Sequence, residues 1–170
     1  MILLRCTQRL LRASRVEPIA EPPAPTAPLG EWYANVVGLP LRGRSLVMFV
    51  HGGTLLSVVA PGRVLGTTVP TFQQRLPDLL RRLDLPPSWV ERHAAAASEV
   101  CFSRTASRSV LGSMNDITPQ IQSEAEMAPS FDHLDLDRLE ERLARVIFGT
   151  LGYRYPTTVL AELVRATPVL

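Results

Sequence analysis

The fold is decided by one stretch in the first third of the chain, Ser45-Leu46-Val47-Met48-Phe49-Val50. After Ser45 this run has no polar residue, which is typical of a central strand that is buried on both faces. Similar runs flank it at residues 31–37 and 54–59, and short segments with Gly or Pro separate the three. Runs of this length joined by short turns predict an antiparallel meander.

Beyond the meander, apolar residues recur every three or four positions, which predicts helices. The expected helical segments are 72–83, 89–98, 109–121, 135–148 and a last helix capped by Thr157 or Thr158. Pro70 suits a first helical turn, whereas Pro77 and Pro119 should kink or split their segments. Because strands cluster before helices, we expect one α+β domain over residues 1–170. Its antiparallel sheet should have four to five strands, with the helices packed on one face.

The segments outside this pattern also have an expected structure. Ile2-Leu3-Leu4-Arg5-Cys6 predicts a strand, and Thr7 would cap a short helix after it. Four arginines without an acid in residues 1–16 are also typical of a mitochondrial transit peptide, but we prefer the strand. Residues 17–28 contain five prolines and predict an extended connector, with a recognition peptide for a proline-binding groove as the alternative. Residues 132–170 are predicted to be C-terminal helices.

Composition excludes several classes of function. The net charge of +2 is too small to indicate a nucleic-acid or membrane partner by itself. All 18 basic residues are arginine, so Schiff-base and P-loop lysine chemistry is excluded. Cys6 and Cys101 match no zinc-binding or redox spacing, and no apolar run is long enough to span a membrane. We therefore expect a cytoplasmic protein with no membrane partner, no metal and no cofactor.

The most polar cluster of the chain, residues 103–116, follows a short strand predicted at Val100-Cys101-Phe102 and opens a helix. The predicted anion-binding residues in it are Arg104, Arg108, Ser109 and Asn115. The N-terminus of a helix offers free N–H groups, and guanidinium groups add bidentate donors. The alternative is purely structural: Ser107 or Ser109 caps the helix, and the arginines face water.

Four further residues are predicted to support this site: Trp32, Asn35, His51 and Gly112. His51 begins a His-Gly-Gly segment that is similar to the oxyanion loop of lipase-like hydrolases, but the chain has no G-x-S-x-G elbow, so a hairpin turn is preferred. Gly112 costs ~1 kcal/mol relative to Ala inside a helix, which indicates close backbone packing or the approach of a ligand. His133 lies among acidic residues, and an acidic helix start explains that pattern better than a metal site.

Four segments together resemble a bacterial family of domains of unknown function. They are Ile2-Leu3-Leu4-Arg5-Cys6-Thr7, Leu29-Gly30-Glu31-Trp32-Tyr33-Ala34-Asn35, Thr54-Leu55-Leu56-Ser57, and Ser107-Arg108-Ser109-Val110-Leu111-Gly112-Ser113-Met114-Asn115-Asp116. The resemblance runs to about Gln122. It implies that the N-terminal strand belongs to the fold, and it brings no known activity, substrate or cofactor.

The leading hypothesis is a non-catalytic binding module, bacterial and cytoplasmic, for an anionic partner: nucleic acid, nucleotide or an acidic protein surface. One alternative is a small toxin-like nuclease or a transferase, in which arginines stabilise charge and His51 acts as general base. Another is a structural partner subunit whose exposed apolar helix face pairs with another chain. The oligomeric state does not follow from the sequence.

Overall fold

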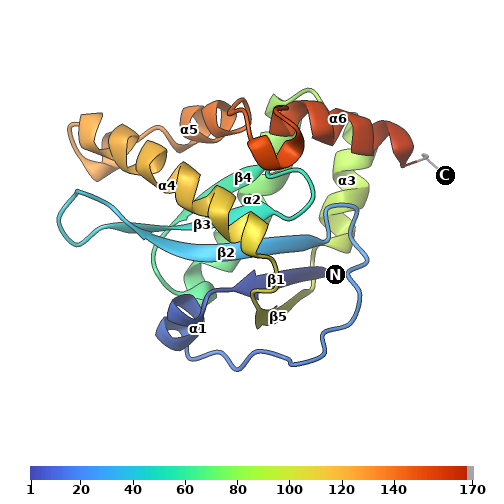
Figure 1. Ribbon diagram of the computed structural model, residues 1–170, viewed down its shortest axis with the longest axis horizontal. Helices are drawn as coiled ribbons and strands as arrows, with labels where there is room; N and C mark the ends of the chain where they lie inside the picture. The colour runs from blue at the N-terminus through green and yellow to red at the C-terminus, as the bar shows by residue number, and fades with distance from the viewer. Residues whose placement is uncertain (168–170) are drawn as a thin grey trace.

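The computed structural model describes residues 1–167, which form an α+β fold around one five-stranded sheet (Figure 1). Its strands are β1 (Ile2–Cys6), β2 (Glu31–Gly38), β3 (Ser45–His51), β4 (Ser57–Pro61) and β5 (Val100–Arg104). The order across the sheet is β4-β3-β2-β1-β5. The meander is confirmed, because β3 pairs antiparallel with both β2 and β4. β4 begins three residues later than expected because residues 54–56 complete the turn after β3.

The expectation of a purely antiparallel sheet is wrong, because β1 runs parallel to both of its neighbours, β2 and β5. Parallel strands need a long crossover connection. The chain provides one between β1 and β2, through a helix and residues 17–28, and another between β4 and β5, through two helices. The sheet is therefore mixed. The transit-peptide alternative does not fit a β1 that is paired on both sides, with β2 and with β5.

Within residues 1–167, six α-helices pack around the sheet. They are α1 (Gln8–Ser14), α2 (Leu65–Arg82), α3 (Pro87–Ala96), α4 (Arg108–Met127), α5 (Leu136–Leu143) and α6 (Pro156–Ala166). The helix predicted for 135–148 ends at Leu143, and Tyr155, not a threonine, precedes the last helix. The predicted C-terminal helices are thus α5 and α6, and positions 168–170 of that prediction lie outside the described residues.

α2 and α4 run unbroken through the prolines that were expected to limit or interrupt them. Pro70 and Pro77 lie inside α2, which begins at Leu65, and Pro119 lies inside α4. A proline within a helix costs roughly 3 kcal/mol. α2 buries eight side chains, and each large apolar one contributes about 1.5–3 kcal/mol. Burial of that face therefore outweighs the two prolines.

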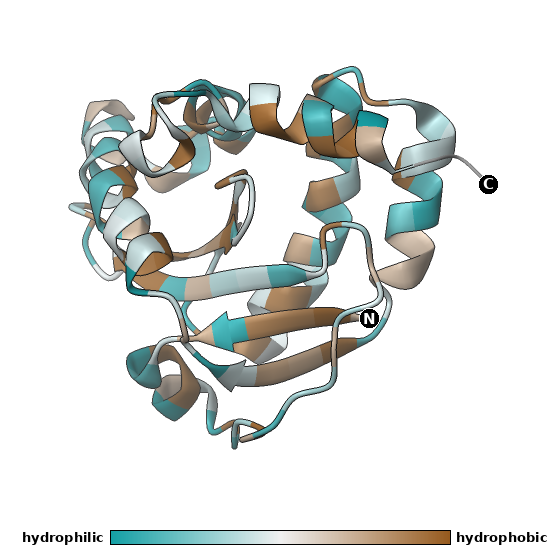
Figure 2. Ribbon diagram, turned by 45° about the vertical axis from the view of Figure 1, so that its right-hand side comes forward, coloured by the Kyte–Doolittle hydropathy of each residue, from teal (hydrophilic) through white to brown (hydrophobic). Residues whose placement is uncertain are grey.

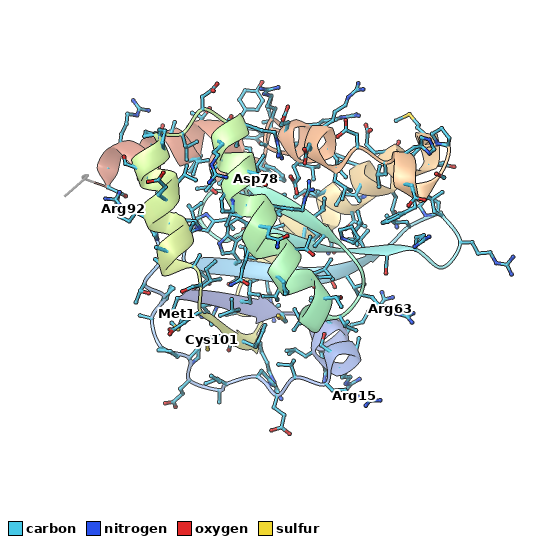
Figure 3. All side chains as sticks on the ribbon, turned by 180° about the vertical axis from the view of Figure 1, so that it is seen from behind. Met1, Arg15, Arg63, Asp78, Arg92 and Cys101 are labelled. Atoms are coloured by element: carbon cyan, nitrogen blue, oxygen red, sulfur yellow. The ribbon has the colours of Figure 1, made fainter. Side chains whose placement is uncertain are left out.

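The helices cover both faces of the sheet, not one as expected. On the first face, Leu4, Trp32 and Phe49 belong to a core shared with α1, α2 and α3. On the second face, Tyr33 and Met48 belong to a core shared with α4 and α5. Figure 1 shows α4 crossing in front of the sheet, and Figure 3, seen from behind, shows α2 and α3 on the other side. Apolar residues line the strands between these two layers (Figure 2).

The proline-rich residues 17–28 form neither helix nor strand, and they lie along the β5 edge of the sheet. The Ile19 N–H donates to the carbonyl of Phe102 in β5 at 2.8 Å. Two further N–H groups, of Thr26 and Ala27, donate to the carbonyl of Met1, both at 3.1 Å. These bonds favour the structural connector over a free recognition peptide.

A charged network that the sequence did not reveal joins α5 to α2 and β4. Glu140 is fully buried, and its carboxylate accepts hydrogen bonds from the backbone N–H of Val59 at 3.0 Å and from Arg75 Nε at 2.9 Å. Arg82 Nη2 lies 2.8 Å from the other carboxylate oxygen. Because β4 is an edge strand, this carboxylate satisfies a donor that would otherwise face outward.

Candidate functional site

The predicted anion-binding residues lie along β5 and α4 but do not form one cluster. Arg104 ends β5, Arg108 and Ser109 open α4, and Asn115 lies two turns further along; all four are exposed. Within residues 1–167, no hydrogen bond or ion pair between their side chains is present. Ser107 is the helix cap, since its Oγ accepts from the N–H of Val110 at 3.3 Å. The structural alternative is therefore correct for the cap.

Two of the predicted supporting residues are core residues. Trp32 is fully buried, and its Nε1 donates to the carbonyl of Leu29 at 2.7 Å. Its ring centroid lies 5.3 Å from that of His51. Burial lowers the pKa of His51 to about 3, and its Nδ1 accepts from the N–H of Thr54 at 3.1 Å. His51 is therefore a core residue whose ring accepts a proton poorly, which argues against its proposed role as a general base.

The other two supporting residues, Asn35 and Gly112, lie on different elements, β2 and α4. Asn35 Oδ1 accepts from Thr7 Oγ1 at 2.9 Å, which joins β2 to the residue after β1. Gly112 is exposed in the middle of α4, and a Cβ built there would meet no atom within 4 Å. Close backbone packing at Gly112, one of its two expected explanations, is therefore wrong.

Arg104 instead belongs to a different cluster of arginines, at the end of the sheet where β1 and β5 both finish. Arg12 in α1, Arg15 directly after α1, and Arg104 line a hollow of about 410 Å³, which we call the arginine hollow. Its remaining lining residues are Gln8, Leu11, Val16, Glu17 and Pro18. Arg15 ends α1 with a φ of 54°, a left-handed conformation that turns the chain into the hollow's wall. Figure 3 labels Arg15 at the end of the molecule that carries α1.

The guanidinium groups of the arginine hollow have no acidic partner. Among residues 1–167, no salt bridge involves Arg12, Arg15 or Arg104. Neighbouring Arg5 differs, because its Nε lies 2.9 Å from Glu31 Oε1 and its Nη1 donates to the carbonyl of Arg104 at 3.4 Å. Exposed guanidinium groups without a partner remain available to a phosphate or carboxylate, which they bind in a bidentate geometry.

The residues that sequence reasoning missed are Arg12 and Arg15. The signal was present, because Arg9, Arg12 and Arg15 recur every three residues in a segment without acids. That pattern was assigned to a targeting peptide or a structural helix. Neither interpretation predicts which other part of the chain lies beside these arginines. Only the fold shows that α1 lies beside the end of β5.

A second hollow is also lined by three arginines and one glutamate, but one of its arginines is already paired. It has about 420 Å³ and is lined by Arg138, Arg142 and Arg145 of the α5 region, together with Glu141. Arg142 forms a salt bridge with Glu124, so one of the three guanidinium groups in this hollow is already paired. This hollow is therefore a matched comparison for the arginine hollow.

The remaining candidates have simpler explanations. Within the part of the chain that the structure describes, no three His, Cys, Asp or Glu side chains are arranged to hold a metal ion. His133 Nδ1 lies 2.8 Å from Ser130 Oγ in a short turn. Cys6 and Cys101 are free and buried, and burial raises the pKa of the Cys6 thiol to about 12. No helix between residues 1 and 167 has both the length and the apolar character that a membrane crossing requires.

A family model described as "Domain of unknown function (DUF6933)" matches residues 3–159. That range includes every residue of the sheet except Ile2, and every lining residue of the arginine hollow. No curated protein matches the chain.

Proposed function

The chain belongs to the DUF6933 family of domains of unknown function, and from the geometry of its site we propose that it is a non-catalytic binding module for an anionic partner, held at the arginine hollow. The observation that carries this proposal is the convergence of Arg12, Arg15 and Arg104, none of them salt-bridged, on one hollow of about 410 Å³. Such a volume is in the range of small-molecule sites, which is about 300–1,000 Å³.

The proposal moves the binding site from the start of α4 to α1. Of the four residues predicted from the sequence, only Arg104 lines the hollow, and Arg108, Ser109 and Asn115 lie outside it. Guanidinium groups favour phosphate and carboxylate because their planar fork matches two oxygens. The partner classes that remain are a nucleotide, a nucleic acid and an acidic protein surface. Two free, buried cysteines fit a reducing bacterial cytoplasm as the place where this binding occurs.

Isothermal titration calorimetry with inorganic pyrophosphate at low salt tests the proposal. The variant Arg12→Ala/Arg15→Ala removes two charges from the arginine hollow, and the control Arg138→Ala/Arg145→Ala removes two from the second hollow. We expect the first variant to bind at least about tenfold more weakly than the wild type, because each charge-assisted hydrogen bond contributes roughly 1.5–3 kcal/mol before solvent screening. The control should bind like the wild type. Equal losses in both variants would mean that only net charge matters, and would refute the site.

A second candidate function, a structural subunit, is favoured by a separate observation. Ile147, Tyr153 and Tyr155 are 54%, 82% and 43% exposed, and they lie on the two arms of a turn closed by the bridge between Phe148 and Arg154. Exposed apolar side chains that lie close together are typical of protein contacts. Sedimentation velocity over a hundredfold concentration range tests this function. Association that Tyr153→Ser abolishes would support it, and a monomer at every concentration would exclude self-association through this turn.

A further inference from the structure

A smaller hollow adjoins the arginine hollow and shares two of its lining residues. It has about 350 Å³ and is lined by Pro18, Ile19, Ala20, Ser103 and Arg104. Pro18 and Arg104 also line the arginine hollow, so the two spaces share these residues as a common wall. We call the smaller space the side hollow.

The side hollow has a fixed, uncharged wall. Ile19 is held against β5 by its N–H, which donates to the carbonyl of Phe102 at 2.8 Å, and by its carbonyl, which accepts from Ser103 Oγ at 2.9 Å. Ile19 is nevertheless 47% exposed. Since Ser103 has already used its hydroxyl proton, the wall offers mainly apolar surface. Arg104 is the one charged lining residue of the side hollow.

The charge of the arginine hollow indicates how much negative charge a bound anion needs in order to balance it. Its three arginines and Glu17 leave a charge of +2. A phosphomonoester carries about −1.5 to −2 at pH 7, so one such group balances the hollow. A nucleic-acid backbone would need more charges along a groove. Single-strand binding would also use stacked aromatic rings, and the exposed aromatic residues Tyr153 and Tyr155 line neither hollow.

We propose that the two hollows together bind a small phosphomonoester, with its phosphate among Arg12, Arg15 and Arg104 and its uncharged body against Ile19. The inference rests on the proposed function, because it specifies the ligand of the same site. It adds a role for the side hollow, which an anion alone would leave unused.

The experiment compares two probes, inorganic phosphate and phenyl phosphate, by calorimetry with the whole chain at low salt. The variant Ile19→Ser removes apolar surface from the side hollow, and Ile147→Ser makes the same change at an equally exposed isoleucine elsewhere. We expect the wild type to bind phenyl phosphate about fivefold more tightly than inorganic phosphate, from the apolar area covered. Ile19→Ser should remove that preference without changing the affinity for inorganic phosphate, and Ile147→Ser should keep it. Circular dichroism verifies that both variants fold.

The contradicting outcomes separate this inference from the proposed function. If inorganic phosphate binds but phenyl phosphate binds no more tightly, the side hollow has no role and the inference fails, while the proposed function stands. If a duplex oligonucleotide binds through Arg12 and Arg15 and neither small probe does, the ligand is a nucleic acid and the inference again fails. If none of the three binds, the arginine hollow binds no phosphate-bearing partner; the inference then fails, and the proposed function fails for nucleotides and nucleic acids.

Discussion

Acidification from pH 7 to pH 5 should destabilise the fold through two buried histidines, His51 and His93. His51 is 6% exposed, and its Nδ1 accepts a hydrogen bond from the backbone N–H of Thr54 at 3.1 Å. His93 is 0% exposed, and its Nδ1 accepts from the backbone N–H of Leu29 at 3.3 Å. Burial lowers the pKa of His51 to about 3 and that of His93 to about 4. Both rings are therefore neutral in the folded protein throughout this pH range.

In the unfolded chain each histidine has a pKa near 6.5. A depressed pKa in the folded state contributes stability that is fully present above pH 6.5 and is lost as the pH falls toward the folded value, because the unfolded state binds the proton first. At pH 5 each histidine should have lost about 2 kcal/mol, from 1.36 kcal/mol per pKa unit, which gives about 4 kcal/mol for the pair. That is a large part of the 5–15 kcal/mol that is usual for a domain.

Urea unfolding at pH 7.0, 6.0, 5.5 and 5.0 measures this loss, and its slope with pH counts the protons taken up. For the wild type, the number of protons taken up on unfolding should approach two between pH 6 and pH 5. His93→Gln keeps an acceptor near Leu29 and should reduce the count to one. His133→Gln, a change at an exposed histidine, should leave it at two. Stability that stays constant from pH 7 to pH 5 would refute the argument from burial.

Two further predictions concern the fold. Glu140→Gln should lower the free energy of unfolding by about 3 kcal/mol, because it leaves the half-buried guanidinium groups of Arg75 and Arg82 facing an uncharged amide at a buried position. Glu141→Gln, at a half-exposed carboxylate, should cost less than about 1 kcal/mol, and equal losses measured by urea unfolding would contradict the role of the network around Glu140. Gly112→Ala should raise the stability by about 1 kcal/mol, since the added methyl group meets no atom and alanine favours the helix; a lower melting temperature would contradict this.

The positions of the strands along the chain were easier to predict than which strands pair and in which direction. β1, β2 and β3 were found within a residue or so because alternation and apolar runs are local features of the sequence. The parallel pairing of β1 was missed because it depends on which connections cross the sheet, and local periodicity does not report that. The unbroken run in β3 did indicate burial on both faces. It should have predicted two helical layers, since a strand apolar on both faces needs cover on both.

The candidate site was predictable only in part. Arg104 was found because it stands in a polar segment after a strand, whereas Arg12 and Arg15 belong to a helix that is remote in sequence. His51 and Trp32 were misassigned because a histidine followed by glycines, and a tryptophan in a recognisable segment, look the same in sequence whether they are buried or exposed. Burial depends on tertiary packing, and this packing places both side chains in the core.

The most direct test of the central claim is an NMR titration with inorganic phosphate that follows the Nε–Hε signals of the arginines. We expect the signals of Arg12, Arg15 and Arg104 to shift together with one affinity, while those of Arg138 and Arg145 stay in place. Shifts of similar size at all five arginines, or none at the first three, would contradict a binding site in the arginine hollow.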